Sequence, residues 1–160
     1  MLKIIYGGQT GVDRGALDAA LDLGVECGGW CPIGRLAEDG TIPERYPVVD
    51  LANAGYAERT AQNVADSDGT LIISNGELIG GTRETVERCV ENDKPCLVID
   101  YKEMPTVDAA EKTLKFLKRH YIRRLNVAGP RASQWPQGQE IACQIVSAIL
   151  PRLSGQNDAN

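Results

Sequence analysis

The sequence is short of the residues and patterns that mark several common classes of function. It contains a single histidine, His120, so it supports neither a Ser-His catalytic pair nor a cluster of histidine metal ligands. No apolar run is long enough to span a membrane, and the amino terminus has no basic-then-apolar leader pattern, so we expect a cytoplasmic protein. Aromatic residues are 5% of the chain and the formal net charge is −5, a balance that disfavours nucleic acid as the main partner.

Cysteine is present but follows no pattern that would build a disulfide framework or a zinc site. The five cysteines are an odd number, which agrees with a reducing compartment. Cys27 and Cys31 have the spacing C-x3-C, but no second pair of Cys or His lies nearby in the sequence, so we predict no metal ligand in this chain. We expect the cysteines to be buried as small apolar residues.

Alternation of apolar strands with helical patterns predicts an α/β fold. A length of 160 residues suits one domain, which we place at residues 1–153, followed by a polar, disordered tail over residues 154–160. With helices between most of the strands and right-handed crossovers, the chain should form a Rossmann-like three-layer sandwich with a mainly parallel sheet. The strands are expected near Ile4, Val25, Leu71, Leu97 and Val127.

The segment from Gly28 to Asn53 does not fit this alternation. It is rich in Gly, Pro and charge and has no clear helical period, so we predict a structured loop that is functional or covers a site. Its polar residues Arg35, Glu38 and Asp39 either belong to a lid or lie on a conventional surface loop.

A glycine-rich turn follows the first strand and forms a candidate phosphate-binding loop. Glycines let the backbone approach a bound group, and the unpaired amides at the start of the next helix favour an anion. Thr10 and Gln9 could donate to phosphate oxygens or ring edges, or Thr10 only caps the helix. Arg14 could make a two-pronged contact with phosphate, while Asp13 orients it or accepts from an amino-bearing ring. The candidate binding residues here are Gly7, Gly8, Gln9, Thr10, Gly11, Asp13 and Arg14.

A second glycine-rich turn lies between the apolar run at residues 70–73 and a helical stretch. Thr82 is expected to cap that helix through the amide of Thr85 as well as to bind the ligand. Because both turns follow parallel strands, we predict that they line one cleft at the carboxyl edge of the sheet. The candidate binding residues of the second turn are Gly80, Gly81, Thr82 and Thr85.

Neither turn matches a named nucleotide motif. The first lacks the final glycine of G-x-G-x-x-G, and the second lacks the Gly-Lys-Ser/Thr ending of a P-loop. Arg59, Thr60 and Asn63 recur at helical spacing, so they share one face of a predicted helix. That face either reaches the same cleft or is an ordinary surface face.

Several blocks of the chain together resemble the putative molybdenum carrier proteins, bacterial relatives of the molybdenum cofactor carrier proteins. The blocks are Gly7 to Ala20, Gly28 to Arg35, Ala37 to Gly40, Arg59 to Val64, Asp66 to Thr70 and Val127 to Arg131. The resemblance implies a Rossmann-like fold shared with the lysine-decarboxylase-like nucleotide phosphoribohydrolases. It also implies a binding or carrier role for molybdenum cofactor of the molybdopterin type, and a homo-oligomer that is a dimer or tetramer.

The phosphoribohydrolase relatives carry P-G-G-x-G-T-x-x-E, which allows a comparison with this chain. Aligned on Gly81 and Thr82, the sequence has Thr85 in place of the glutamate and Ile79 in place of the proline. Glu84 lies one position early, which turns its side chain by about 100° on a helix. We therefore favour a binding or carrier protein for a phosphorylated small molecule and name no catalytic residue. The alternatives are a phosphoribohydrolase-like enzyme, or a nucleotide or nucleic-acid binder on the same fold.

Overall fold

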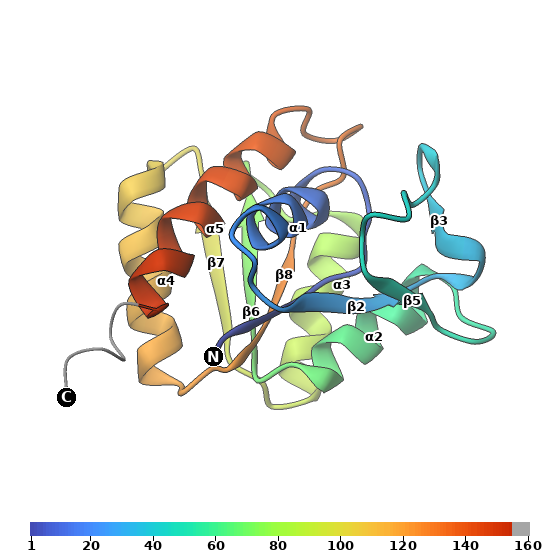
Figure 1. The fold of residues 1–160 in the computed structure, drawn as a ribbon, viewed down its shortest axis with the longest axis horizontal. Coiled ribbons are helices and arrows are strands. Elements are labelled where there is room, and N and C mark those ends of the chain that lie inside the picture. Colours follow the sequence, from blue (N-terminus) through green and yellow to red (C-terminus); the bar gives the residue numbers. More distant parts are fainter. Residues whose placement is uncertain (155–160) are drawn as a thin grey trace.

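Within residues 1–154, which the computed structural model describes, six parallel strands form a central sheet with helices on both faces (Figure 1). Across the sheet the strands run β5 (Val48–Asp50), β2 (Cys27–Cys31), β1 (Lys3–Ile5), β8 (Arg124–Ala128), β6 (Gly69–Ser74) and β7 (Cys96–Asp100). Neighbouring strands are parallel throughout. The predicted sandwich with a mainly parallel sheet is confirmed, and residues 155–160 of the predicted tail lie outside the described residues.

The helices form two outer layers. Those of the described residues are α1 (Val12–Asp22), α2 (Tyr56–Asp66), α3 (Gly80–Glu91), α4 (Thr106–Arg119) and α5 (Gly138–Ser154). The first, fourth and fifth pack together on one face of the sheet, and α2 packs with α3 on the other (Figure 1). The apolar core lies under the first group and includes Ile4, Leu17, Leu71, Val127 and Ile145. Over residues 1–154, no helix is both long enough and apolar enough to cross a lipid bilayer.

The sheet face under α2 and α3 carries a buried polar pair between its central strands. Nδ2 of Asn126 in β8 donates to Oγ1 of Thr70 in β6 over 3.2 Å, and both residues are buried. A slip of one strand against the other would leave both groups buried without a partner, which costs about 1–3 kcal/mol for each. The pair therefore favours one register for the two strands whose carboxyl ends carry the later loops.

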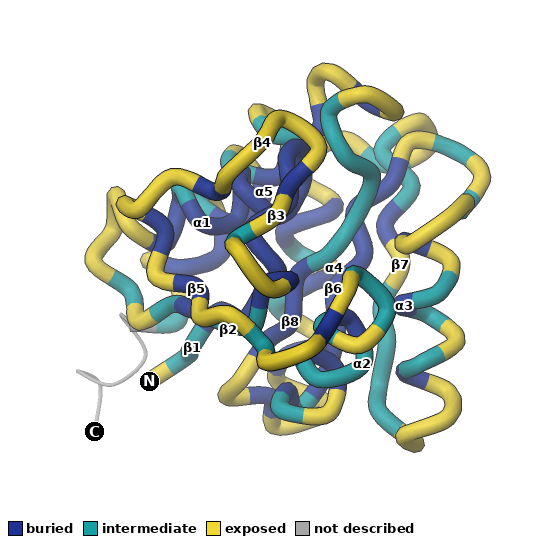
Figure 2. The backbone as a smooth tube through the Cα atoms, turned by 90° about the vertical axis from the view of Figure 1, so that its right-hand side faces the viewer, coloured by how far each residue is buried: buried dark blue, intermediate teal, exposed yellow. Residues whose placement is uncertain are grey.

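The segment from Gly28 to Asn53 contains more regular structure than predicted. β2 begins at Cys27, two residues beyond Val25, and ends at Cys31. β5 is a sixth strand that no apolar run marked, because it has only three residues and follows a proline. Between them lie a 3-10 helix, η1 (Ile33–Arg35), and an antiparallel hairpin of β3 (Leu36–Ala37) and β4 (Gly40–Thr41). Figure 2 shows most of this hairpin exposed, whereas the central strands are buried.

The connections diverge at strands β1, β8 and β6, where the sheet is best placed to bind a ligand. The chain leaves β1 toward α1 on one face and leaves β6 toward α3 on the other, with β8 between them. Because the three strands are parallel, their carboxyl ends lie at the same edge. Open α/β sheets bind ligands in the crevice at such a point.

Candidate functional site

The first glycine loop, residues 7–11, has a close backbone approach at Gly11 that requires glycine and a side chain that lies over Gly7. Gly11 has φ 80°, and a Cβ there would lie 2.4 Å from the carbonyl oxygen of Pro130. A Cβ on Gly7 would lie 1.7 Å from Nη1 of Arg59. The loop therefore packs against the turn after β8 on one side and against the guanidinium of Arg59 on another.

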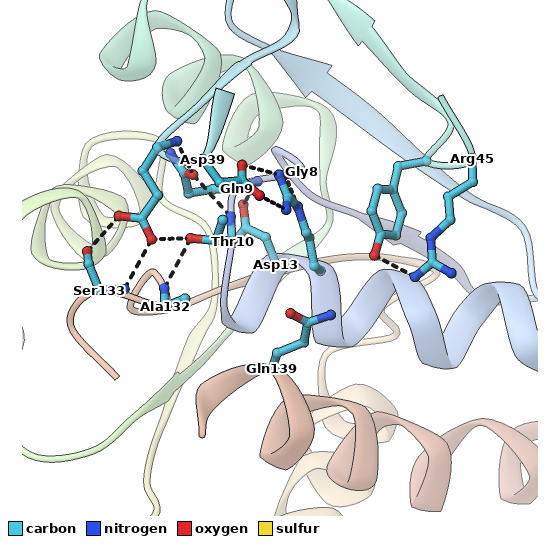
Figure 3. A network of polar contacts seen from close by, with 12 residues as sticks. Gly8, Gln9, Thr10, Asp13, Asp39, Arg45, Ala132, Ser133 and Gln139 are labelled. Atoms are coloured by element: carbon cyan, nitrogen blue, oxygen red, sulfur yellow. Dashed lines mark hydrogen bonds and ion pairs between the residues drawn. The ribbon is translucent and has the colours of Figure 1, made fainter. Parts of the chain in front are cut away.

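The hairpin closes the outer side of the first glycine loop with two carboxylates (Figure 3). The Thr10 hydroxyl donates to Oε1 of Glu38. Arg14 donates from Nη1 and Nη2 to the Asp39 carboxylate over 2.6 and 2.9 Å, and from Nε to the carbonyl of Gly8 over 3.2 Å. These hydrogen bonds from the guanidinium lower the pKa of Asp39. The two side chains predicted to hold a ligand phosphate thus hold carboxylates of the same chain. Of the three polar residues given the lid or surface-loop alternative, Glu38 and Asp39 lie against the first glycine loop, whereas Arg35 donates to backbone carbonyls of its own segment.

Glu38 also joins the first glycine loop to the turn after β8. The Ser133 amide and hydroxyl donate to its carboxylate over 3.1 and 2.6 Å, and the Ala132 amide donates to the Thr10 hydroxyl oxygen over 3.1 Å. Desolvation raises the pKa of Glu38, but the hydrogen bonds from Ser133 and Thr10 outweigh it and leave the pKa below its usual range. The carboxylate is therefore charged at neutral pH and its acceptors are used within the protein.

The second glycine loop, residues 79–82, opens onto a cleft at the carboxyl edge of the sheet. The cleft has a volume of about 50 Å³ and is lined by both glycine loops, α2, α3 and the turn after β8. The two loops therefore share one cleft, as predicted. The candidate residues that line it are Gln9, Asp13, Gly81, Thr82 and Thr85. The other candidates, which shape or close the first loop or open α3, are Gly7, Gly8, Thr10, Gly11, Arg14 and Gly80.

Two buried side-chain donors at the cleft, Nε2 of Gln9 and Nε of Arg59, have no hydrogen-bond partner among residues 1–154. The hydroxyl of Thr82, whose residue is 5% exposed, makes no hydrogen bond within the same residues either. The Gln9 amide oxygen accepts from the amides of Thr10 and Glu38, each over 3.0 Å, so the side chain is fixed with Nε2 free. Buried donors are nearly always paired, so free ones in a cleft are available to a ligand's acceptors.

Asp13 and Arg59 form a long, buried ion pair in the same cleft. Nη1 of Arg59 lies 3.4 Å from Oδ2 of Asp13, and the two side chains are 13% and 5% exposed. The same Oδ2 accepts from the Gln9 amide over 3.3 Å. Burial raises the pKa of Asp13, and the charge of Arg59 offsets part of that rise. The expectation that Asp13 orients Arg14 is wrong, because Asp13 contacts Arg59 and Arg14 turns to the hairpin.

The helix after the second glycine loop is not capped by Thr82. α3 begins at Gly80 with Ile79 at the N-cap position, and no side chain caps it. Thr82 already lies inside the first helical turn, so its hydroxyl cannot take the place that an N-cap side chain has. The Thr85 hydroxyl donates to the carbonyl of Gly81 over 2.8 Å. The predicted cap is therefore wrong, and the Thr82 hydroxyl is left free.

The α2 side of the cleft agrees in part with the sequence. Arg59 and Thr60 line the cleft, as one of the two alternatives for that helix predicted. Asn63 does not, because its side chain is hydrogen-bonded on both sides to the backbone of Trp30, over 2.8 and 2.9 Å. Arg59, Thr60 and Asn63 do share one side of α2, but Asn63, one turn after Arg59, contacts strand β2 of the sheet and not the cleft.

The turn after β8 supplies residues that the sequence reasoning did not assign to the site. Arg131 and Gln134 line the cleft, together with Tyr56 from the start of α2. The Arg131 guanidinium lies 5.4 Å from the centre of the Tyr56 ring, a cation–π distance. The signal was present in the sequence, since Gly129-Pro130-Arg131 directly follows a strand in the same way as the two glycine loops.

A larger groove of about 360 Å³ lies elsewhere and does not share these features. It is lined by Lys3, Ile5, Gly29, Trp30, Val49, Asp66 and Arg124. Its indole donor is used within the protein, because Nε1 of Trp30 donates to Asp66 over 2.7 Å. Among the residues that the structure describes, no group of three or more His, Cys, Asp and Glu side chains is placed to hold a metal ion. We therefore assign the candidate site to the smaller cleft, where free donors converge.

Known proteins resemble this chain over nearly its whole length. Residues 4–150 match the circularly permutated YpsA SLOG family. The crystal structure of a putative molybdenum carrier protein from Syntrophus aciditrophicus SB has a TM-score of 0.91 and 44% sequence identity, covering 94% of this chain and 95% of that one. None of the curated proteins matches the sequence significantly.

Proposed function

This chain belongs to the circularly permutated YpsA SLOG family, and from that membership and the chemistry of its cleft we propose that it binds and carries a phosphorylated small molecule. The observation that carries the proposal is the meeting of unpartnered donors from both glycine loops, Gln9 Nε2 and the Thr82 hydroxyl, beside two arginines in one cleft. A phosphate group has both the acceptor oxygens and the negative charge that such a donor set favours.

The start of α3 is the proposed phosphate site. The first hydrogen bond of this helix runs from the Arg83 amide to the Ile79 carbonyl over 3.4 Å, so the amides before Arg83 have no helical partner. A Cβ on Gly81 would meet no protein atom within 4 Å, which leaves room for a ligand to approach the backbone. Amides of this kind and the positive end of the helix dipole favour an anion. Arg59 and Arg131 lie in the same cleft and can add charge.

The ligand that we propose is a molybdenum cofactor of the molybdopterin type. The name of the similar protein from Syntrophus aciditrophicus, a putative molybdenum carrier, supports this choice. The residues of the cleft fit the parts of such a molecule. The start of α3 suits its phosphate, and the free Gln9 amide with the Asp13 carboxylate offers a donor and an acceptor to the polar edge of the pterin ring.

Contacts at α3 count against the phosphoribohydrolase alternative. Glu84 reaches the rim of the cleft, but its Oε1 lies 3.2 Å from Nη2 of Arg88, one turn farther along the helix. Thr85, at the position of the relatives' glutamate, has its hydroxyl on the carbonyl of Gly81. A general acid or base must reach the reacting atom. We therefore propose binding without hydrolysis.

Release of the bound molecule tests the proposal. Purified protein is denatured, the released material is oxidised, and fluorescence and absorbance spectra are recorded. Pterin fluorescence is the expected result. Nucleotide absorbance without pterin fluorescence would mean that the ligand is a nucleotide and not a pterin. The variant to compare with the parent is Gly81→Ala. Its methyl group would lie near no other part of the protein, but it would narrow the proposed phosphate site. This variant should fold normally and release less ligand. Release of neither a pterin nor a nucleotide, together with no binding of added phosphorylated compounds, would make the proposal wrong.

We also propose that the chain assembles as a homo-oligomer, a dimer or tetramer. Support comes from the resemblance of the sequence blocks to the putative molybdenum carrier proteins, which implies such an assembly. The exposed Val90 on α3 and Val107 on α4 do not add to it, because they lie on opposite faces of the sheet and form no shared patch. Light scattering at micromolar concentration should give a mass that is a multiple of 17.3 kDa. A single monomeric species under these conditions would contradict this proposal.

A further inference from the structure

We propose that ligand binding separates Arg59 from Asp13, and that the freed Asp13 selects ligands whose ring presents two adjacent N–H donors. Arg59 then pairs with the ligand phosphate. This inference rests on the proposed function and names the class of ring, the 2-amino-4-oxo pyrimidine edge that pterins and guanine share.

Arg59 is a buried, weakly held side chain that fills part of the cleft. Its guanidinium covers the bare backbone of Gly7, with Nη1 only 1.7 Å from where a Cβ would be. It is held loosely, because Nε has no partner among the described residues and Nη1 contacts Asp13 at 3.4 Å. The cleft volume of about 50 Å³ is far below the ~300 Å³ of a typical small-molecule site. A ring-bearing ligand therefore needs side chains of the cleft to move, and Arg59, with its long ion pair and free Nε, is the one that we expect to move.

Movement of Arg59 changes the charge balance of the cleft. Without its guanidinium, the Asp13 carboxylate would remain buried with only the backbone amides of Gln9 and Gly7 as donors. An ion whose partner has been removed from a buried pair is strongly destabilised. The ligand must therefore return hydrogen-bond donors to Asp13 while its own anion binds the arginine. Inorganic phosphate alone cannot do both. The hydroxyls of a sugar or two adjacent N–H groups of a ring can supply the donors, and the fixed amide beside Asp13 favours the ring.

Gln9 supplies the complementary donor. Its side chain is 6% exposed, and Nε2 is free while the amide oxygen is fixed by two backbone amides. A 2-amino-4-oxo edge presents an amino group, a ring N–H and a carbonyl oxygen in sequence. The first two suit the Asp13 carboxylate and the third suits Gln9 Nε2. Adenine presents an acceptor nitrogen where the ring N–H is needed, so the lone pair of that nitrogen would face the Asp13 carboxylate and repel it.

Calorimetry with matched ligands tests the inference. We expect guanosine monophosphate to bind the parent protein about tenfold or more tightly than inosine monophosphate, which lacks only the amino group. Inorganic phosphate should bind more weakly than either. Neopterin monophosphate carries the same edge on a pterin ring. Comparing its affinity with that of guanosine monophosphate shows whether the site prefers a pterin or a purine. Equal affinities for guanosine and inosine monophosphates would overturn the inference and leave the proposed function standing. No binding of any phosphorylated probe would overturn both.

Two variants separate the roles of the residues. Asp13→Asn keeps the shape of the side chain and should abolish the preference for guanosine over inosine monophosphate. Arg59→Gln should keep that preference but reduce the advantage of guanosine monophosphate over guanosine, because the phosphate loses its arginine. A full preference in Asp13→Asn, or an unchanged phosphate advantage in Arg59→Gln, would contradict the assignment. Melting temperatures are measured for each variant, and if Asp13→Asn does not fold, the parent's ligand preference and Arg59→Gln still decide the result.

Discussion

The two glycine loops are similar in sequence and differ in what they contact. In the first, Thr10 and Arg14 are hydrogen-bonded to Glu38 and Asp39 of the hairpin. In the second, no protein atom lies within 4 Å of the place of a Cβ on Gly81, and the Thr82 hydroxyl has no partner in the described chain. The first loop therefore joins parts of the protein, while the second presents its donors to the cleft.

The difference shows that a glycine turn after a strand does not by itself reveal a binding surface. The donors of such a turn face a ligand only when no other segment of the chain occupies the same space. Here the hairpin does so for one loop and leaves the other open. Gln9 of the first loop and Asp13 at the start of α1 nevertheless face the cleft. The first loop and its helix therefore supply side chains to the site, and the second loop supplies backbone amides and the Thr82 hydroxyl.

The largest effect that would test this comparison is steric. Gly11→Ala should lower the free energy of unfolding by about 3 kcal/mol or more, because the residue has φ 80° and its Cβ would lie 2.4 Å from the Pro130 carbonyl. Gly81→Ala should instead raise it by about 0.5–1 kcal/mol, since alanine is the better helix former and meets no protein atom. Urea denaturation measures both, and similar effects of the two substitutions would remove the distinction between the loops.

The second test removes the link between the hairpin and the first loop. Arg14→Ala should lower the free energy of unfolding by about 2–3 kcal/mol, because it deletes a buried guanidinium with three hydrogen bonds. The control is Arg83→Ala on the second loop's helix, where the side chain is 69% exposed and lies 3.9 Å from Glu87. That change should stay within about 0.5 kcal/mol. Equal destabilisation by both would show that Arg14 is not a structural clamp.

A smaller effect is expected for the free hydroxyl of the second loop. Thr82→Val should weaken binding of neopterin monophosphate by about 1 kcal/mol, roughly fivefold, and leave the melting temperature nearly unchanged. Thr113→Val is the control, since its hydroxyl donates to the Ala109 carbonyl over 2.8 Å in a helix outside the cleft. It should lower stability slightly and leave affinity unchanged. If calorimetry gave Thr82→Val the same affinity as the parent, the Thr82 hydroxyl would not contact the ligand.

The smallest expected effect is the part of the acid dependence that comes from Asp39, the hairpin carboxylate paired with Arg14. Asp39 has a lowered pKa in the folded protein, so its charge contributes stability above its ordinary pKa and loses that contribution as the pH falls below about 4. Melting curves from pH 7 to pH 3 should therefore show a difference between the parent and Asp39→Asn that shrinks in acid. A difference that does not change with pH would mean that the ion pair with Arg14 contributes no pH-dependent stability.

Local patterns in the sequence were sufficient for the order of the main strands and helices and for the meeting of both loops in one cleft. They failed where the deciding contact is distant along the chain. Nothing near Thr10 or Arg14 indicates that residues 25 to 28 positions later occupy their donors. The short strand β5 was missed because three residues give no period to read. Thr82 was misplaced as a cap because the helix begins two residues earlier, at Gly80.

The position of β1 has a consequence for when the cleft can form. The strand comes first in the chain but lies in the middle of the sheet, paired with β2 on one side and with β8, residues 124–128, on the other. The first glycine loop also packs against the turn after β8. During synthesis, β1 must therefore wait until β8 has left the ribosome before its second neighbour exists. A chain that stops before β8 would have both glycine sequences but no cleft, so the site can form only after residue 128 has been made.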